Sequence, residues 1–272
     1  MLQTGVIGVG CLGEAVLKEL SESRGYKRDF GALLFYHPRK ERCQEIEEKG
    51  YGRSVDLEKV LRCDVIFLLV KPSQIEDLLE KIVPLLETKP LFISGIAGVP
   101  LSYLESKLGK ERIIRMMTNL IGFNNNTKVF YYPATESIVP GVLSYLGSTE
   151  LCHKEKTLDV ATPVFGSGPA FIARLYQAYL RSSLKFYQEA DIHRYDIIYE
   201  DDISELFAMT TQKISSPRDA EEIIRKIASP GGSTQKGLEI LETLEDLLLQ
   251  SFEVSYKRCQ EIREEFLLKI ME

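Results

Sequence analysis

The sequence of 272 residues lacks the features of membrane, metal-binding and disulfide-stabilised proteins. Its five cysteines are odd in number, widely spaced and free of any Cys-x-x-Cys pair, which excludes a zinc site or a disulfide framework and indicates reduced thiols. The three histidines, His37, His153 and His193, do not form a spaced set of metal ligands. The longest apolar run, residues 65–70, is far shorter than the roughly 20 residues that span a bilayer. The chain start also lacks the basic region of a signal peptide, so we expect a cytoplasmic protein without a metal.

Positive charge is in deficit, with 34 lysines and arginines against 40 acidic residues. This balance excludes a general nucleic-acid or anionic-membrane binder, because such proteins need a basic face. Hydrophobic residues make up 44% of the chain and charged residues 27%, which is ordinary globular usage and enough to build a core. At roughly 150 residues per domain, the length predicts two domains.

The first part of the chain alternates strand-type and helical segments. We predict strands at residues 4–9, 32–36, 64–70 and 91–94, with edge strands at 112–117 and 129–132. Apolar residues at helical spacing predict helices at 12–20 and 75–86, the second opened by a capping box of Ser73 and Glu76. Strands that alternate with helices predict an α/β fold with a doubly wound, mostly parallel sheet of Rossmann type.

From about residue 158 the pattern becomes helical. Segments 171–187 and 244–271 carry apolar residues three and four positions apart. We therefore expect a Rossmann domain over residues 1–157 and an all-helical domain over residues 158–272. A helical region of only about 115 residues with such long elements would expose an apolar patch as a monomer, which favours a subunit interface over an internal core.

A glycine-rich turn follows the first predicted strand. The sequence GVGCLG at residues 8–13 fits the pattern GxGxxG and leads into a helix. In a dinucleotide site the first glycine allows the tight turn, the second lets a pyrophosphate approach, and the third brings helix and strand together. The order of strand, glycines, helix and second strand favours dinucleotide binding over a glycine-rich turn without a ligand.

The end of the second predicted strand distinguishes NAD from NADP. An acidic residue there binds the ribose 2′-hydroxyl, whereas positive charge accommodates a 2′-phosphate. Here His37 is followed by Arg39 and Lys40, with no carboxylate before Glu41. The sequence therefore favours NADPH, with NADH possible as a second cofactor; the alternative is that Arg39 and Lys40 only begin a solvated helix.

Five further segments follow the glycine turn in a characteristic order. They are Val70-Lys71-Pro72, SGIAG at 94–98, Met117-Thr118-Asn119, GSGPA at 166–170 and SPGGST at 229–234. Together with the glycine turn, they make nearly the whole chain resemble the pyrroline-5-carboxylate reductase family. Glycine-rich hydroxyl clusters such as GSGPA and SPGGST are unusual inside a helical domain, so these two segments are the most specific.

The resemblance implies a reductase that converts 1-pyrroline-5-carboxylate to L-proline with NADPH, the last step of proline synthesis, and a homodimer or larger homo-oligomer built on the C-terminal helices. By position, the implied cofactor-binding residues are Gly8, Gly10, Cys11, Leu12 and Gly13 at the pyrophosphate, Tyr36, His37 and Arg39 at the 2′-phosphate, and Val70, Lys71, Pro72, Gly95, Ile96 and Ala97 beside the nicotinamide. The implied catalytic residues, which would bind the imine acid, are Ser229, Gly232, Ser233 and Thr234.

Hydride transfer to an imine requires the protein mainly to position the cofactor and the substrate. The cofactor transfers the hydride, so the protein must hold it against the imine carbon, and no nucleophile is required. A turn with two glycines and two hydroxyls offers N–H and O–H donors to the substrate carboxylate, a role that suits Ser233 and Thr234. The alternative is that Ser233 or Thr234 only caps a helix. No residue stands out as a general acid.

The chain departs from the family pattern at three places, one of which is Asp56, where many members carry asparagine. Leu120-Ile121 replace a Thr-Pro pair, and residues 181–228 have Lys185-Phe186-Tyr187 and an acidic run at 200–202 where the family has small residues. These departures leave other functions open. They are a divergent paralogue that reduces another cyclic imine or keto acid, a non-catalytic NADPH-binding regulatory protein, and a dimeric scaffold with a vestigial glycine turn.

Overall fold

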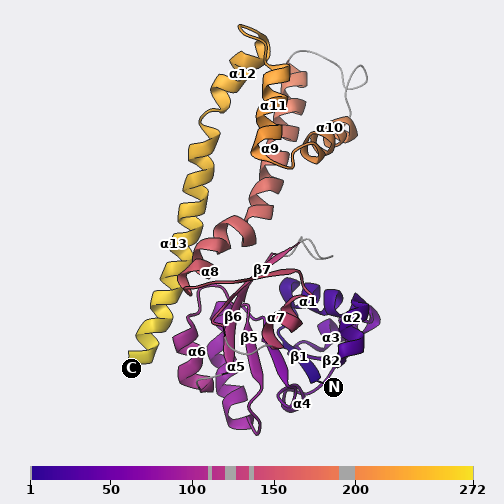
Figure 1. The fold of residues 1–272 in the computed structure, drawn as a ribbon, viewed down its shortest axis with the longest axis vertical. Coiled ribbons are helices and arrows are strands. Elements are labelled where there is room, and N and C mark those ends of the chain that lie inside the picture. Colours follow the sequence, from indigo (N-terminus) through magenta and orange to yellow (C-terminus); the bar gives the residue numbers. More distant parts are fainter. Residues whose placement is uncertain (1, 110–111, 120–126, 135–137, 190–199, 272) are drawn as a thin grey trace. The chain divides into compact units, whose positions relative to one another are not determined.

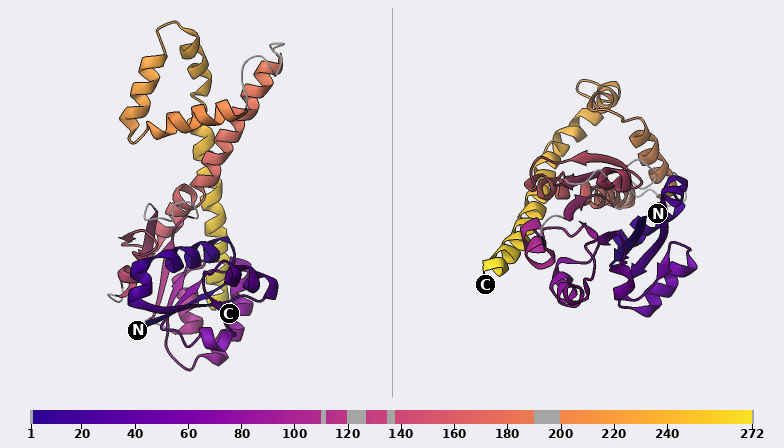
Figure 2. Two further views of the ribbon diagram at one scale, coloured as in Figure 1. Left: turned by 90° about the vertical axis from the view of Figure 1, so that its right-hand side faces the viewer. Right: turned by 60° about the horizontal axis from the view of Figure 1, so that its bottom comes forward.

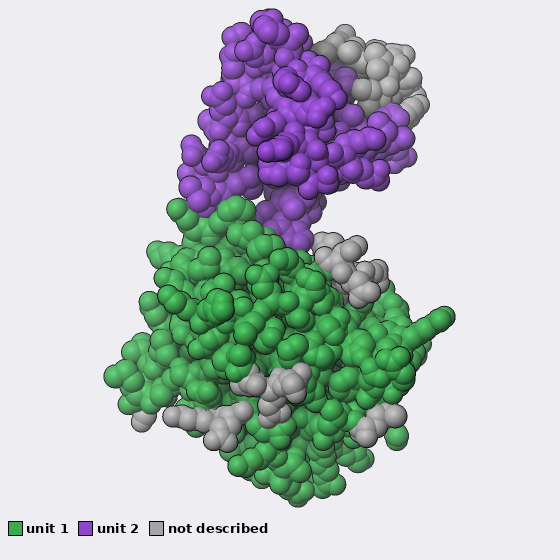
Figure 3. All heavy atoms as spheres, viewed as in Figure 1, with its two compact units in different colours: residues 1–167, 252–272 green, residues 168–251 purple. Residues whose placement is uncertain are grey.

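The computed structural model describes residues 2–109, 112–119, 127–134, 138–189 and 200–271 (Figure 1). The Leu120-Ile121 departure and His193 lie outside these ranges. The chain forms two compact units, one of residues 1–167 with 252–272 and one of residues 168–251 (Figure 3). None of the described helices is both long and apolar enough to cross a bilayer.

The described strands of the first unit form one sheet in the order β3-β2-β1-β4-β5-β6-β7-β8. They are β1 (Leu2–Ile7), β2 (Phe30–Tyr36), β3 (Arg53–Ser54), β4 (Val65–Leu68), β5 (Leu91–Ser94), β6 (Ile113–Met117), β7 (Lys128–Tyr132) and β8 (Ser148–Leu151). Strands β1 to β6 are parallel, whereas β7 runs antiparallel to β6. The order 3-2-1-4-5-6 is that of a Rossmann fold and confirms the predicted fold class. Its strand order reverses between β1 and β4, where ligands bind in such sheets.

Both faces of the sheet are buried at the central strands β4, β5 and β6, which explains their continuous apolar runs. Neighbouring residues of a strand point to opposite faces, so Val65 and Phe67 enter one core while Ile66 and Leu68 enter the other. One face is covered by α1 (Cys11–Glu22), α2 (Arg24–Asp29), α3 (Lys40–Glu48) and α7 (Ile138–Leu143). The other is covered by α4 (Leu57–Val60), α5 (Ile75–Ile82), α6 (Leu101–Leu108) and the end of α13 (Leu244–Met271) (Figure 2).

The predicted capping box of Ser73 and Glu76 is wrong. Ser73 lies in a 3-10 turn, Pro72–Gln74, and α5 begins only at Ile75. The Glu76 carboxylate instead accepts hydrogen bonds from the Tyr103 hydroxyl (3.4 Å) and from Lys269 Nζ. The Glu76 side chain therefore binds partners on α6 and α13, whereas the local pattern predicted a hydrogen bond between this side chain and the backbone.

The second unit consists of helices with little core of their own. It contains α9 (Gly168–Glu189), α10 (Glu200–Gln212), α11 (Pro217–Ile227), α12 (Ser233–Leu241) and the start of α13. The Tyr176 hydroxyl lies 2.6 Å from Ser204 Oγ, and its ring packs on Phe207. Among its residues with a described burial, only Gly168 and Ile203 are buried.

The compact units do not divide at residue 158. Helix α8 (Lys156–Ala161) and residues 252–271 belong to the unit that holds the sheet. The physical reason is that Arg263 of α13 forms ion pairs beside α8, and Phe266 packs its ring on Tyr103, 4.6 Å between centroids.

Candidate functional site

The glycine turn lies at the carboxyl end of β1, beside the reversal of strand order. Gly8 has a φ of +96°, and a Cβ on it would lie 2.6 Å from Val70 Cγ1. The carbonyl oxygen of Gly8 fills the place of a Cβ on Gly13, so helix α1 and the strand end touch there. A Cβ on Gly10, by contrast, would meet no described protein atom within 4 Å. The space before Gly10 and the N-terminus of α1 is therefore free for a pyrophosphate, and the residues fit this group.

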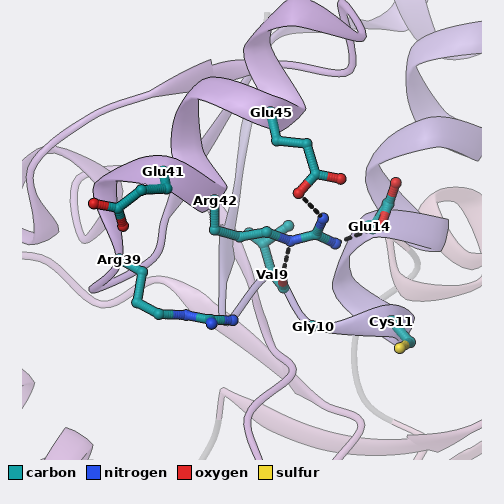
Figure 4. Close-up of a pocket in the computed structure, with 8 residues that line it drawn as sticks. All are labelled: Val9, Gly10, Cys11, Glu14, Arg39, Glu41, Arg42 and Glu45. Carbon is teal, nitrogen blue, oxygen red and sulfur yellow. Dashed lines mark hydrogen bonds and ion pairs between the residues drawn. The ribbon is translucent and has the colours of Figure 1, made fainter.

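A pocket of about 510 Å³ opens on the β2 side of this turn; we call it the β2-side pocket (Figure 4). It is lined by Val9, Gly10, Cys11, Glu14, Arg39, Glu41, Arg42 and Glu45. The pocket brings Gly10 and Cys11 of the turn together with Arg39, which follows β2. In a Rossmann fold this is the side of the adenosine ribose.

Arg42 is bound within a network of charges. Its Nε donates to the carbonyl oxygen of Val9 at 3.0 Å, and its guanidinium pairs with Glu14 and, at 2.6 Å, with Glu45. Lys49 completes the network, 2.8 Å from Glu14 and 2.7 Å from Glu45. Two cations thus balance two carboxylates. The network fixes α3 to α1 and leaves Arg42 little free charge for a ligand.

Arg39 differs from Arg42. Its side chain makes no hydrogen bond or ion pair with any residue in the described part of the chain, and it extends along the pocket (Figure 4). The Arg39 backbone amide donates to His37 Nδ1 at 3.1 Å. Burial, followed by the charges of Arg39 and Arg42, lowers the pKa of His37, so its imidazole is neutral at pH 7. Arg39 therefore carries the positive charge available to a ligand of this pocket.

A second pocket of about 220 Å³ lies over β5 and β6; we call it the β5-side pocket. It is lined by Leu12, Gly95, Ile96, Ala97, Arg115, Met116, Met117, Thr118, Asn119, Leu158, Thr162 and Gly166. Leu12 belongs to the glycine turn, so the turn contributes to both pockets. A Cβ on Gly95 would lie 2.7 Å from Leu69 Cδ2 and 3.4 Å from Leu12 Cδ2, so the end of the Leu69 side chain would have to shift for any larger residue there.

The predicted cofactor residues divide into those that line a pocket and those that shape it. Gly8, Gly13, Tyr36, His37, Val70, Lys71 and Pro72 line neither pocket. Tyr36 accepts a hydrogen bond from the Gly8 amide at 3.1 Å through its carbonyl, and Val70 packs at Gly8. Lys71 is exposed, and its amide donates to Gln74 Oε1 at 3.2 Å. The sequence reasoning missed Glu14, Arg42 and Glu45. The three-residue spacing of Arg42 and Glu45 on α3 is a signal for these two, whereas Glu14 on α1 gives none.

The predicted substrate residues lie in the second unit, at the start of α12. Helix α12 begins at Ser233 with Gly232 as its N-cap, so the segment does start a helix, as the alternative interpretation expects, but neither Ser233 nor Thr234 is its capping residue. Gly231 has a φ of +73°, and its amide donates to Gln235 Oε1 at 2.6 Å. Ser233 and Thr234 are exposed in the first turn, where backbone N–H groups have no partner within a helix. No group of three potential metal ligands occurs among the described residues.

Comparison with known proteins gives matches to both parts of the chain. A family model described as pyrroline-5-carboxylate reductase dimerisation matches residues 155–262, and one described as NADP oxidoreductase, coenzyme F420-dependent, matches residues 3–98. The chain is 31% identical over 209 residues to the pyrroline-5-carboxylate reductase of Staphylococcus saprophyticus, covering 72% of this chain and 73% of that protein. It is 25% identical over 277 residues to pyrroline-5-carboxylate reductase 2 of Bacillus subtilis, covering 98% and 97%.

Solved structures share the fold. The 1-pyrroline-5-carboxylate reductase of Streptococcus pyogenes superposes with a TM-score of 0.76 at 24% identity, over 96% of this chain and 98% of that chain. The pyrroline carboxylate reductase of Plasmodium falciparum, solved with NADP bound, gives a TM-score of 0.75 at 22% identity over the same shares.

Proposed function

Because the chain belongs to the pyrroline-5-carboxylate reductase family, we propose that it reduces 1-pyrroline-5-carboxylate to L-proline by hydride transfer from NADPH. The family makes it an NAD(P)H-dependent oxidoreductase of proline biosynthesis. The observation that carries the proposal is the glycine turn, whose Gly10 faces open space between two pockets at the point where strand order reverses.

The chain's own residues have the roles of binding and orienting the cofactor. Gly10, Cys11 and the N-terminus of α1 hold the pyrophosphate, because free backbone N–H groups and the helix dipole favour negative charge there. Leu12 and residues 95–97 line the β5-side pocket, which takes the nicotinamide. When bound, the cofactor supplies the hydride, so these residues need only fix its reactive face and exclude water.

The preference for NADPH rests on Arg39. A guanidinium in the β2-side pocket that has no partner among the described residues can form charge-assisted hydrogen bonds with a 2′-phosphate. Glu41 lines the same pocket and offers an acceptor to a ribose hydroxyl, so NADH is the second cofactor to test.

Substrate binding is assigned to the turn before α12. The exposed first turn of α12 offers N–H and O–H donors. The residues around this helix start are Ser229, Gly232, Ser233 and Thr234. The substrate carries a carboxylate, which is the group that such a helix start attracts.

In a homodimer, a second copy of the chain buries apolar side chains that the second unit leaves exposed. With only two buried residues among those of described burial, this unit has little core of its own to stabilise it. Its exposed apolar side chains include Ile172, Tyr179, Phe186, Leu206, Met209, Ile224, Ile227, Ile240, Leu247 and Leu249. The match to the family's dimerisation model covers this region and supports a subunit interface on these helices.

The test is the loss of NADPH absorbance when the purified protein meets DL-pyrroline-5-carboxylate, run beside NADH and a control without the imine. We expect oxidation that depends on the imine and yields proline. NADPH binding without oxidation would contradict the proposal and point to another imine, a keto acid or a regulatory role. If the protein binds no nucleotide at all, only the alternative of a dimeric scaffold with a vestigial glycine turn would remain.

A further inference from the structure

Four charged side chains form a cluster that adjoins the β5-side pocket through Arg115. The Arg115 guanidinium lies 2.6 Å from Glu155 and 2.9 Å from Asp159. Arg263 pairs with the same two carboxylates, at 2.8 Å from Glu155 and 3.1 Å from Asp159. The side chains of Arg115 and Asp159 are only 4% and 5% exposed, whereas those of Glu155 and Arg263 are 14% and 28% exposed, so the cluster is buried at its Arg115 end. We call these four residues the Arg115–Arg263 cluster.

The cluster is electrically neutral only because Arg263 takes part. Each carboxylate is shared by both guanidinium groups, and two positive charges balance two negative ones. Without Arg263, one negative charge would be left in excess beside Arg115. Buried charges keep much of their strength because the surrounding protein screens them poorly. An excess charge here would therefore act on whatever occupies the pocket that Arg115 lines.

The same cluster joins two walls of the pocket, β6 and α8, to helix α13, which does not itself line the pocket. Arg115 comes from β6, the two carboxylates lie at the start of α8 and within it, and Arg263 comes from α13. Leu158, between the carboxylates, also lines the pocket. The amide of Leu101, at the start of α6, donates to Glu155 Oε1 at 2.7 Å.

Helix α13 touches the pocket wall at a second place. Gly98 lies in the loop between β5 and α6, which begins at Gly95, and has a φ of +77°. A Cβ on Gly98 would lie 2.9 Å from Ile262 Cβ and 3.0 Å from the Cys259 carbonyl oxygen. The helix thus packs directly on the loop that carries Gly95, Ile96 and Ala97.

We propose that Arg263 is a positioning residue for the nicotinamide, acting through Arg115 to keep the β5-side pocket neutral and its walls in place. This inference rests on the proposed function, which puts the nicotinamide in that pocket. The oxidised ring carries a positive charge, whereas the reduced ring is neutral. A pocket with excess negative charge would retain NADP⁺ after the reaction, so neutrality favours exchange of NADP⁺ for NADPH.

The test measures the dissociation constants of NADP⁺ and NADPH for the full chain by titration, without turnover. In Arg263→Met we expect the ratio Kd(NADP⁺)/Kd(NADPH) to fall about three- to tenfold, from one excess negative charge near the ring. Asp159→Asn leaves one excess positive charge, so the ratio should rise. The double variant is neutral again, and its ratio should return toward that of the unmodified protein.

Arg258→Met is the matched control, since Arg258 lies on the same helix and pairs with Glu261 at 2.9 Å on the surface. Its ratio should not change. If folded Arg263→Met and Asp159→Asn both weaken the binding of NADP⁺ and NADPH equally, the inference is overturned. A purely structural role would not depend on the sign of the charge that is removed. If Arg263→Met does not fold, an unchanged ratio in Asp159→Asn overturns it. Failure of the unmodified protein to bind either nucleotide would instead overturn the proposed function.

Discussion

The carbonyl oxygen of Gly8 occupies the position that a Cβ on Gly13 would need. The oxygen belongs to the backbone, and the Cβ is fixed on its own backbone, so no flexible side chain can move aside. We expect Gly13→Ala to lower the free energy of unfolding by about 3 kcal/mol, at the upper end of the usual cost of overpacking. Urea denaturation of the variant beside the unmodified protein measures the change. A loss below 0.5 kcal/mol, on the order of a neutral surface substitution, would contradict this close approach.

Gly10→Ala should have the opposite pattern. A Cβ on Gly10 meets no described protein atom within 4 Å, and Gly10 has an ordinary φ of −79°, so we expect unchanged stability. The added methyl group would stand where the pyrophosphate approaches, and the Kd for NADPH should rise at least about tenfold. Gly141→Ala is the control, since a Cβ there also meets no described atom and Gly141 lies in α7. Unchanged NADPH affinity in Gly10→Ala would refute the assignment of this turn.

The sequence predicts those features whose signal is local. The run of Val65 to Leu68 identifies a strand buried on both faces, and the spacing of the glycines at 8, 10 and 13 identifies the turn, because each depends on residues a few positions apart. The capping box at Ser73 fails because Glu76 has partners 27 and 193 residues away.

The charged parts of the candidate site are not local, and sequence reasoning missed them for that reason. Arg42 meets Glu14 across 28 residues, and Arg115 meets Asp159 across 44. Such pairs are set by which helices the sheet brings side by side. The same limit applies to the compact units, since Arg263 pairs with Glu155 across 108 residues and joins the chain's end to the sheet.

Replacement of Arg39 tests the choice of cofactor. In Arg39→Ala, loss of one charge-assisted contact should raise the Kd for NADPH about tenfold, while the Kd for NADH changes less than about twofold. Arg24→Ala is the control, because Arg24 is exposed at the start of α2 and does not line the pocket. If Arg39→Ala raises the Kd values of NADPH and NADH equally, Arg39 does not bind the 2′-phosphate. Titration of each nucleotide without substrate makes the measurement independent of turnover.

Replacement of Thr234 tests the substrate turn. In Thr234→Ala we expect the KM for the imine acid to rise about tenfold, as for loss of one hydrogen bond to a charged group, with NADPH affinity unchanged. Thr243→Ala, whose hydroxyl donates to the Ile240 carbonyl at 3.3 Å, removes a similar exposed group from the same unit and should have no effect. Steady-state kinetics with the imine varied at saturating NADPH give the answer. Unchanged substrate kinetics would exclude Thr234 from binding the carboxylate.

Acid should weaken the Arg115–Arg263 cluster through Glu155. Burial alone would raise the pKa of Glu155, but the hydrogen bond from Arg263 and the charge of Arg115 outweigh it and lower the pKa below its ordinary 4.5. A carboxyl whose pKa is lowered by folding stabilises the protein fully above its unfolded pKa, and this stability is lost as the pH falls through the folded pKa. We therefore expect unfolding free energy to decline as the pH falls below about 4.5.

Glu155→Gln isolates this contribution from that of other acids. At pH 7 the variant should be less stable by about 3 kcal/mol, because it leaves the buried Arg115 and the partly buried Arg263 with one carboxylate. The difference from the unmodified protein should shrink as the pH falls, since protonated Glu155 resembles glutamine. Glu58→Gln, exposed on α4, is the control and should show no such difference. Urea denaturation across the acid range measures both, and a difference that stays constant with pH would show that the Glu155 charge contributes nothing to stability.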